Sequence, residues 1–298
     1  MRTTHREPTS VADVAPADKY TRRGLLLYLV VTFLVSWGSW TIAIQLGGSA
    51  NDFPTVALFA LGGFGPLIGA AVVRYRRRRQ PAPTHAVRSR GWRLAWMLPA
   101  LVMGAGSVGL GALISAALGG PALDLTSCLD VVAESGGWLA FVGLTLVTGP
   151  LAEEPGWRGT AYPRLRARMG RLLAMLILGT VWAVWHLPLF FIPDTIQNLW
   201  GLNTWEGLFF LLAIYPLTVL TSFAYERAGV AASVMVHFGL NGAITLLSVN
   251  APLTLGMSVA VLTVVASIVL VTSKPKPTAV EQMRMKGVDS ERRTQLMR

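Results

Sequence analysis

Apolar runs of about 20 residues, separated by short polar loops, dominate this sequence and limit what it can fold into. Hydrophobic side chains make up 53% of the 298 residues and charged ones only 14%, which is unlike a soluble globular protein. Inside a bilayer, only helices and closed barrels satisfy every backbone hydrogen bond, and runs of this length are typical of helices. The sequence therefore predicts an all-α, polytopic membrane protein.

The apolar runs predict eight transmembrane helices in one domain at residues 24–272. The predicted spans are 24–46, 53–73, 94–118, 138–160, 172–191, 205–225, 231–249 and 251–272. The polar segments 1–23 and 273–298 are interpreted as tails, the second of them basic. The first apolar run is longer than the core of a cleaved signal peptide, so we expect it to be retained as a span.

The basic residues occupy every second connection between the predicted spans. All 26 Lys and Arg residues fall in these places: 1–23, 74–93, 158–171, 227 and 274–298. The opposite loops contain Asp52, Asp124, Asp130 and Asp194 instead. By the positive-inside rule, both termini are expected in the cytoplasm. This placement also explains the net charge of +11 without a nucleic-acid partner, since the patterns of nucleic-acid-binding motifs are absent.

Two adjacent glutamates interrupt the fourth predicted span. Glu153 and Glu154 are followed by Arg158, and prolines and glycines break the helical hydrogen bonding around them. A charge in mid-membrane costs about 3 kcal/mol or more, so such groups usually face a protein interior or a wet cavity. The spacing predicts a helical ion pair between Glu154 and Arg158, which leaves Glu153 free to titrate. A purely structural role would account for only one of the two carboxylates.

Three further polar side chains lie in neighbouring apolar segments. Glu153 and His186 lie at similar distances along the chain from a turn predicted near Gly170, so an antiparallel hairpin would bring them to the same depth. A carboxylate and an imidazole at one level can deprotonate a water molecule. His237 and Asn241, four residues apart, share a helix face and suit an oxyanion. The alternative for such residues is interhelical hydrogen bonding, and Trp182 and Trp185 are expected to be packing residues.

The polar residues form three motifs that resemble those of the CPBP (CAAX protease and bacteriocin-processing) family of intramembrane proteases, which includes CAAX prenyl proteases and the bacterial Abi proteins. The motifs are Glu153-Glu154-Pro-Gly-Trp-Arg158, Trp182-Ala-Val-Trp-His186 and His237-Phe-Gly-Leu-Asn241. The second departs from the family pattern, with Trp182 where Phe is usual, and this difference is expected to alter packing rather than chemistry.

The resemblance implies an endopeptidase with a defined set of roles. Glu153 and His186 would activate water, His237 and Asn241 would form the oxyanion hole, and Glu154 and Arg158 would support them. A metal-free mechanism is favoured, because the resemblance to the CAAX prenyl proteases points that way. The alternative is a zinc ion held by Glu153, His186 and His237, because a catalytic zinc needs three such ligands and an open position.

Other functions are left open by the sequence. A non-catalytic immunity or scaffold protein would keep the fold and bind a partner through the same cavity. A transporter would usually show repeated halves, which are not found. The expected partners are a peptide or membrane-protein substrate and the lipid bilayer, and the expected location is a bacterial plasma membrane. The sequence does not identify the substrate or the oligomeric state.

Overall fold

The computed structural model describes residues 14–76 and 90–273, which form helices and no strand. The outer parts of both predicted tails, 1–13 and 274–298, lie outside the described residues, but α1 already begins at Val14, within the first predicted tail. The helices are α1 (Val14–Leu46), α2 (Thr55–Gly63), α3 (Gly65–Arg76), α4 (Arg90–Ala95), α5 (Met97–Ala117), α6 (Leu125–Glu134), α7 (Trp138–Val147), α8 (Pro150–Gly156), α9 (Tyr162–Arg166), α10 (Arg171–His186), α11 (Ile196–Trp200), α12 (Trp205–Ala228), α13 (Val230–Leu246) and α14 (Pro252–Thr272), with a π-helix η2 (Trp157–Ala161) and a 3-10 helix η3 (Leu187–Phe191).

The fold is that of an all-α, polytopic membrane protein, as predicted. Among the described residues, 5 helices are long and apolar enough to cross a bilayer, and there are up to 7 if each of two bent helix pairs forms one span. One bent pair, Thr55–Gly63 with Gly65–Arg76, corresponds to the predicted span 53–73. The other joins Thr126–Glu134, which lies outside the predicted spans, to Trp138–Arg166, which contains the predicted span 138–160. The remaining predicted span, 231–249, is the shorter apolar helix α13. The count of eight therefore stays a prediction that depends on how α13 and the bent pairs meet the lipid.

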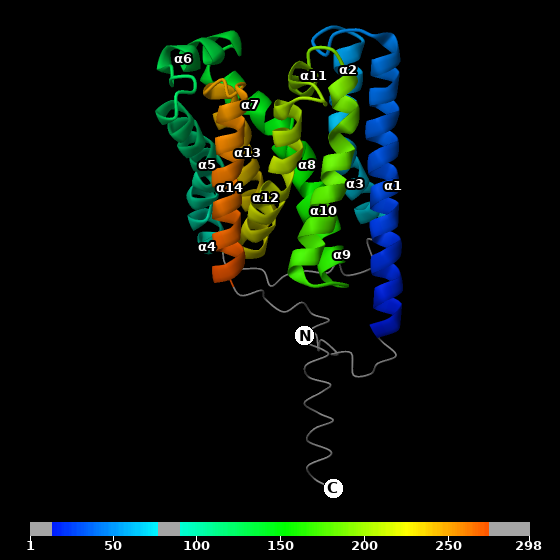
Figure 1. Ribbon diagram of the computed structural model, residues 1–298. Helices are drawn as coiled ribbons and strands as arrows, with labels where there is room; N and C mark the ends of the chain where they lie inside the picture. The colour runs from blue at the N-terminus through cyan, green and yellow to red at the C-terminus, as the bar shows by residue number, and fades with distance from the viewer. Residues whose placement is uncertain (1–13, 77–89, 274–298) are drawn as a thin grey trace.

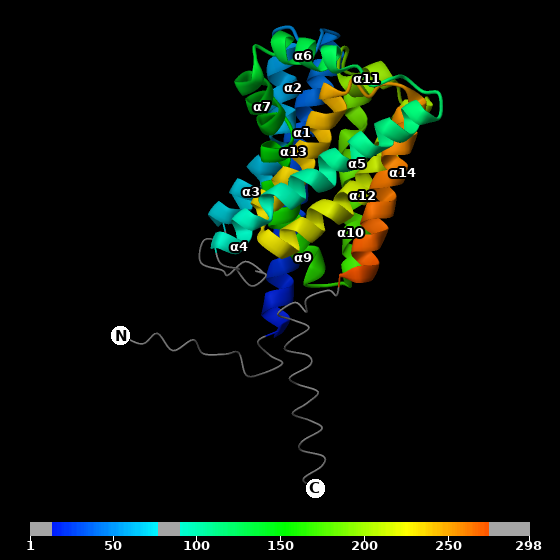
Figure 2. The same ribbon diagram turned by 90° about the vertical axis from the view of Figure 1, so that its left-hand side faces the viewer.

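The helices stand side by side, and the two ends of the bundle differ in charge (Figure 1). The start of α1, the end of α3, α4, α9 and the end of α14 lie at one end, which carries the described basic residues outside the spans. The loop between α1 and α2, α6 and α11 lie at the other end (Figures 1 and 2), near Asp52, Asp124, Asp130 and Asp194. There Asp124 caps α6, and its hydrogen bonds from the Thr126 hydroxyl and N–H hold the pKa of Asp124 below its usual range.

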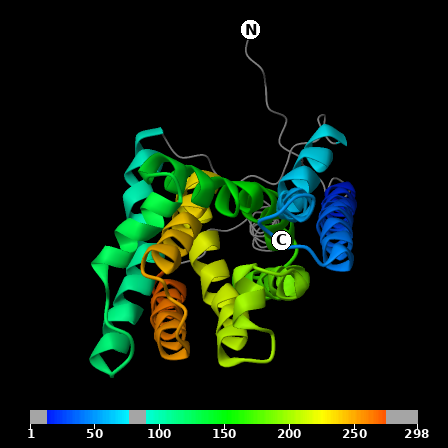
Figure 3. The same cartoon turned by 90° about the horizontal axis from the view of Figure 1, so that it is seen from above.

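The short helix α13 is held in the bundle by close backbone contact with α5. A Cβ on Gly104 would lie 2.0 Å from the Val236 carbonyl oxygen, and one on Gly239 would lie 2.4 Å from the Leu101 carbonyl oxygen. Small residues on both helices thus allow the backbones to touch, as is common in membrane bundles. Because α13 also packs against α8 and α12, its polar residues His237 and Asn241 lie inside the bundle. Seen from above, α5 and α1 lie at opposite sides of it (Figure 3).

The chain from α7 to α9 is an irregular helix, as the prolines and glycines predict. Gly149 lies between α7 and α8, and Pro155 lies within α8. Since Pro155 has no N–H to donate, the regular hydrogen-bond ladder fails there, and the next turn is the π-helix η2. The Thr160 hydroxyl donates to the Pro155 carbonyl oxygen at 3.2 Å. This irregular stretch carries Glu153, Glu154 and Arg158 into the core.

Candidate active site

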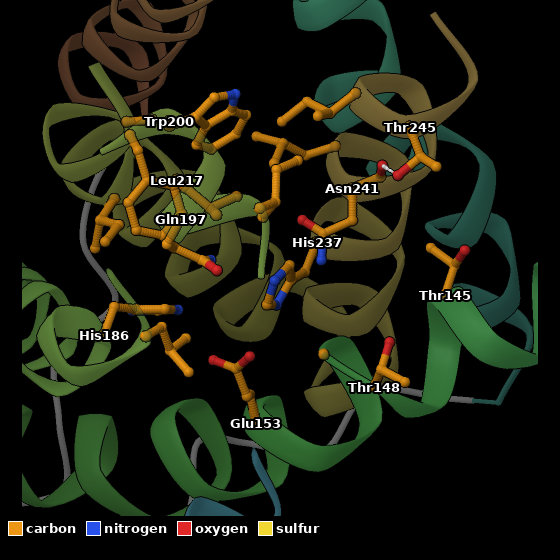
Figure 4. Close-up of a pocket in the computed structure, with 18 of the residues that line it drawn as sticks. Thr145, Thr148, Glu153, His186, Gln197, Trp200, Leu217, His237, Asn241 and Thr245 are labelled. Carbon is orange, nitrogen blue, oxygen red and sulfur yellow. Dashed lines mark hydrogen bonds between the residues drawn. The ribbon is translucent and has the colours of Figure 1, made fainter. Parts of the chain in front are cut away.

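A cavity of about 470 Å³ brings together the four residues predicted to be catalytic. Glu153 comes from α8, His186 from the end of α10, and His237 and Asn241 from α13, and all four line this cavity. In Figure 4, their side chains converge on one space from three sides. The predicted hairpin around Gly170 and the shared face of His237 and Asn241 are both confirmed by this arrangement.

Glu154 forms a fully buried ion pair at the back of the site. Its Oε1 accepts a hydrogen bond from Arg158 Nη1 at 3.1 Å, and both side chains are 0% exposed. The pairing predicted from their spacing is therefore confirmed. The same oxygen lies 2.9 Å from His237 Nδ1, and since a carboxylate only accepts, the histidine donates this bond. Glu154 thus fixes the His237 ring and turns its Nε2 away from the ion pair.

Arg158 pairs with Glu154, so Glu153 stays outside the ion pair, as predicted, but its carboxylate has another partner. Its Oε2 accepts a hydrogen bond from Trp182 Nε1 at 2.7 Å. The prediction treated Trp182 as a packing residue and missed this donor. Trp182 precedes His186 by one helical turn, so its position on the same face of α10 is the sequence signal that would have indicated a place in the site.

The hydrogen bonds of His186 determine its tautomer. Its Nδ1 lies 2.8 Å from the Trp182 carbonyl oxygen, which only accepts, so Nδ1 carries a hydrogen. In the neutral ring, Nε2 is then an acceptor. The side chain is 8% exposed and lines the cavity, so this nitrogen is the ring's remaining proton-accepting atom. A neutral imidazole of this tautomer can take a proton from water.

Atoms of three predicted site residues lie close to Gly149, which was not among the predicted site residues. A Cβ at Gly149 would lie 3.0 Å from Asn241 Nδ2 and 3.8 Å from both Glu153 Oε1 and His237 Nε2. Since glycine has no side chain, nothing at Gly149 fills the part of the cavity that these atoms border. An amide N–H donor, an imidazole nitrogen and a carboxylate oxygen therefore surround one small space.

The zinc alternative needs three ligand side chains close to one another. The part of the chain that the structure describes contains no group of three or more His, Cys, Asp or Glu side chains that could hold a metal ion. We therefore derive no step through the zinc ion considered as an alternative.

The rest of the cavity wall is mainly apolar and aromatic. Its apolar side chains include Phe141, Trp200, Phe210, Leu217 and Leu262. A few neutral polar groups, among them Thr145, Gln197 and Thr245, also face it (Figure 4). Pockets of this type bury most of an apolar ligand and orient it through a few polar groups.

The fold and the cavity define a polytopic helical membrane protein with a buried polar site, and comparisons with known proteins identify its relatives. The family model described as "Type II CAAX prenyl endopeptidase Rce1-like" matches residues 135–243, a segment that includes every predicted site residue. The curated "CAAX prenyl protease 2" of Methanococcus maripaludis is 32% identical over 92 residues, which are 30% of this chain. The match spans 34% of the length of that relative. Residues 135–243 are therefore similar to the Rce1-like family, which confirms the resemblance indicated by the motifs.

Proposed function

We propose that the protein is an intramembrane endopeptidase that hydrolyses a peptide bond with a water molecule activated by Glu153 and His186. The observation that carries this proposal is that Glu153 Oε1, His237 Nε2 and Asn241 Nδ2 all lie close to Gly149 and border the same cavity. General bases and oxyanion donors must surround one reacting atom in this way. The family of the matched segment supports the same reaction class.

The proposed reaction needs no group beyond substrate, water and the side chains of the cavity. Glu153 and His186 accept a proton from water while its oxygen bonds to the substrate carbonyl carbon. The carbonyl oxygen becomes an oxyanion and accepts hydrogen bonds from Asn241 and His237, the latter as an imidazolium with Glu154 as counter-ion. When the C–N bond breaks, the amine nitrogen takes up the proton, and a carboxylic acid and an amine leave.

The proposed substrate is a peptide or membrane protein that enters the cavity from the bilayer or its cytoplasmic face. The relative's name refers to prenylated CAAX sequences, which makes a farnesylated peptide a suitable first probe, although we expect a bacterial protein with an unprenylated natural substrate. The alternating basic loops support a plasma-membrane protein with both termini in the cytoplasm.

The experiment that tests this function compares peptide termini in membranes from cells that produce the parent protein or Glu153→Ala. Mass spectrometry should find new carboxyl and amino termini with the parent that are missing with Glu153→Ala. Glu134→Ala is the matched control, because Glu134 is an exposed carboxylate on α6 and should give the parent pattern. Identical termini with the parent and Glu153→Ala would overturn the proposal.

A non-catalytic binding protein predicts a different result for Glu153→Gln. This side chain is nearly isosteric with glutamate but is a far weaker base, so a hydrolase should lose cleavage. A binder that only recognises the shape of the cavity should keep its phenotype.

A further inference from the structure

Trp182 contacts four of the predicted site residues through different parts of its structure. Its indole N–H donates to Glu153 Oε2 at 2.7 Å, and its backbone carbonyl accepts from His186 Nδ1 at 2.8 Å. The Arg158 guanidinium lies over its ring, 4.1 Å from the centroid. Its ring also meets that of His237 edge-on, with centroids 5.4 Å apart.

The position of the indole is itself tightly fixed. Trp182 is 1% exposed, and one face of its ring carries the Arg158 cation, an attraction that strengthens when such a pair is desolvated. Arg158 Nε and Nη2 have no hydrogen-bond partner among the described residues, which is consistent with an aromatic face covering the guanidinium. Since Arg158 is anchored by Glu154, the ion pair holds the indole, and the indole holds Glu153.

We propose that Trp182 is a positioning residue for the hydrolytic base: its N–H fixes one carboxylate oxygen of Glu153 and so aims the other at the substrate. This inference rests on the proposed function. The two oxygens are distinct in the structure, because Oε2 accepts the indole bond while Oε1 lies on the Gly149 side of the site. A carboxylate free to rotate would present Oε1 to water in only part of its orientations. A phenylalanine, which is usual at this place in the family motif, has no N–H and provides no such restraint.

The departure of this chain from the family motif therefore changes the chemistry of the site and not only its packing. An indole of this kind restricts the base to one rotamer before substrate arrives. Preorganisation of this type acts on the chemical step, because the reacting atoms start nearer to their productive geometry.

The kinetic test uses Trp182→Phe in lipid nanodiscs with a quenched fluorescent peptide that ends in a farnesylated Cys-aliphatic-aliphatic-X sequence. We expect kcat to fall about tenfold, the size of one lost hydrogen bond to a charged group, with KM unchanged. Replacement of Trp182 by benzothienylalanine keeps the ring size and removes only the N–H, so it should give the same kcat loss even if the smaller Phe disturbs folding.

The matched control is Trp157→Phe. Trp157 is as buried as Trp182, but its Nε1 has no hydrogen-bond partner within the described chain and the residue does not line the cavity. This substitution should leave kcat and KM unchanged. A kcat for the benzothienylalanine protein equal to that of the parent, or an equal loss in Trp157→Phe, would overturn the inference.

A spectroscopic measurement tests the hydrogen bond between Trp182 and Glu153 independently of the proposed function. The difference between the resonance Raman spectra of the parent and Trp182→Phe isolates the indole N–H band of Trp182, which should lie at the frequency of a strongly hydrogen-bonded indole. Glu153→Leu should move it to the frequency of an unbonded one, and an unmoved band would contradict the contact. If the parent and Glu153→Ala hydrolyse the farnesylated peptide equally, or neither does, the proposed function fails for this probe, while the Raman result still decides whether Trp182 restrains Glu153.

Discussion

Two clusters of polar and charged side chains among the described residues differ in whether they border the cavity. The first, the cavity cluster, consists of Glu153, Glu154, Arg158, His186 and His237. In the second, the closed cluster of Tyr162, Arg171, Glu226 and Ser273, the Tyr162 hydroxyl donates to Glu226 Oε1 at 2.6 Å and Arg171 Nη2 lies 3.1 Å from Glu226 Oε2. Arg171 also donates to the Ser273 hydroxyl at 2.7 Å and carbonyl oxygen at 3.0 Å.

The two clusters differ in the polar atoms that they leave open to a ligand. In the closed cluster both oxygens of Glu226 are used by neighbouring side chains, and none of its members lines the cavity. In the cavity cluster, Glu153 and the two histidines each keep one atom for a ligand. The closed cluster joins α9, α10 and α12 and ties α10 to the residue after α14, so we assign it a stabilising role.

The largest expected effect is a loss of activity, and it comes from a substitution in the cavity cluster. Glu153→Ala should lower kcat by about 1000-fold or more, since general-base catalysis contributes a factor of about 100 to 10,000. The unfolding midpoint in detergent should stay close to that of the parent, because no ion pair is broken. Steady-state cleavage of the farnesylated peptide measures the first quantity, and a thermal melt measures the second. Turnover equal to the parent would remove Glu153 from the chemistry.

The next largest effect is expected on stability, from a substitution in the closed cluster. Glu226→Ala leaves the Arg171 guanidinium without its carboxylate, and breaking a buried ion pair in this way typically costs about 3–5 kcal/mol. The free energy of unfolding, measured by denaturant titration in micelles, should fall by that amount, while kcat per folded molecule stays unchanged.

The control for this prediction removes both charges at once. Glu226→Leu combined with Arg171→Met should regain most of the lost stability, because no unpaired charge is left inside the bundle. A loss of kcat in the folded Glu226→Ala protein would break the distinction between the two clusters.

A smaller loss of kcat is expected when a side chain is added beside the site, at Gly149. Gly149→Ala would put a methyl group 3.0 Å from Asn241 Nδ2, so the amide must shift by a few tenths of an ångström. We expect kcat to fall about tenfold, less than the factor of about 100 or more for complete loss of an oxyanion donor. Gly143→Ala on α7 is the matched control, since nothing lies within 4 Å of its Cβ position. Equal kinetics for Gly149→Ala and the parent would show that the reacting carbonyl lies elsewhere.

The smallest effect is expected from chelators. The described residues bring no set of three metal ligands together, so incubation with 1,10-phenanthroline or EDTA should leave the cleavage rate unchanged. Loss of the rate on chelation, with recovery on added zinc, would contradict the metal-free reaction that we propose.

Local patterns predicted much of the site and the fold. The helical spacing of Glu154 and Arg158 predicted their ion pair, and the spacing of His237 and Asn241 predicted their shared face. The basic and acidic loops predicted which ends of the helices lie together. These features depend on helix geometry and on the length of apolar runs, both of which are encoded within short segments of chain.

The errors concern contacts between segments. The sequence gives no measure of how far the indole of Trp182 reaches across from α10 to α8, so its hydrogen bond to Glu153 was not predicted. It also did not show that the glycine before α8 faces Asn241 rather than merely interrupting a helix. Both facts depend on the path of the irregular chain around Pro155 and η2, where regular helix geometry no longer predicts direction.

The sequence by itself determined that this chain crosses a membrane as helices, which of its polar residues are buried there and which neighbours along one helix pair with each other. Hydrophobicity and helical periodicity are local properties, and they suffice for these conclusions. Only the tertiary structure decided which oxygen of Glu153 is held, which atoms meet beside Gly149 and which charged cluster is closed. Those outcomes depend on distances between helices far apart in the chain, which are set by the close backbone packing of the whole bundle.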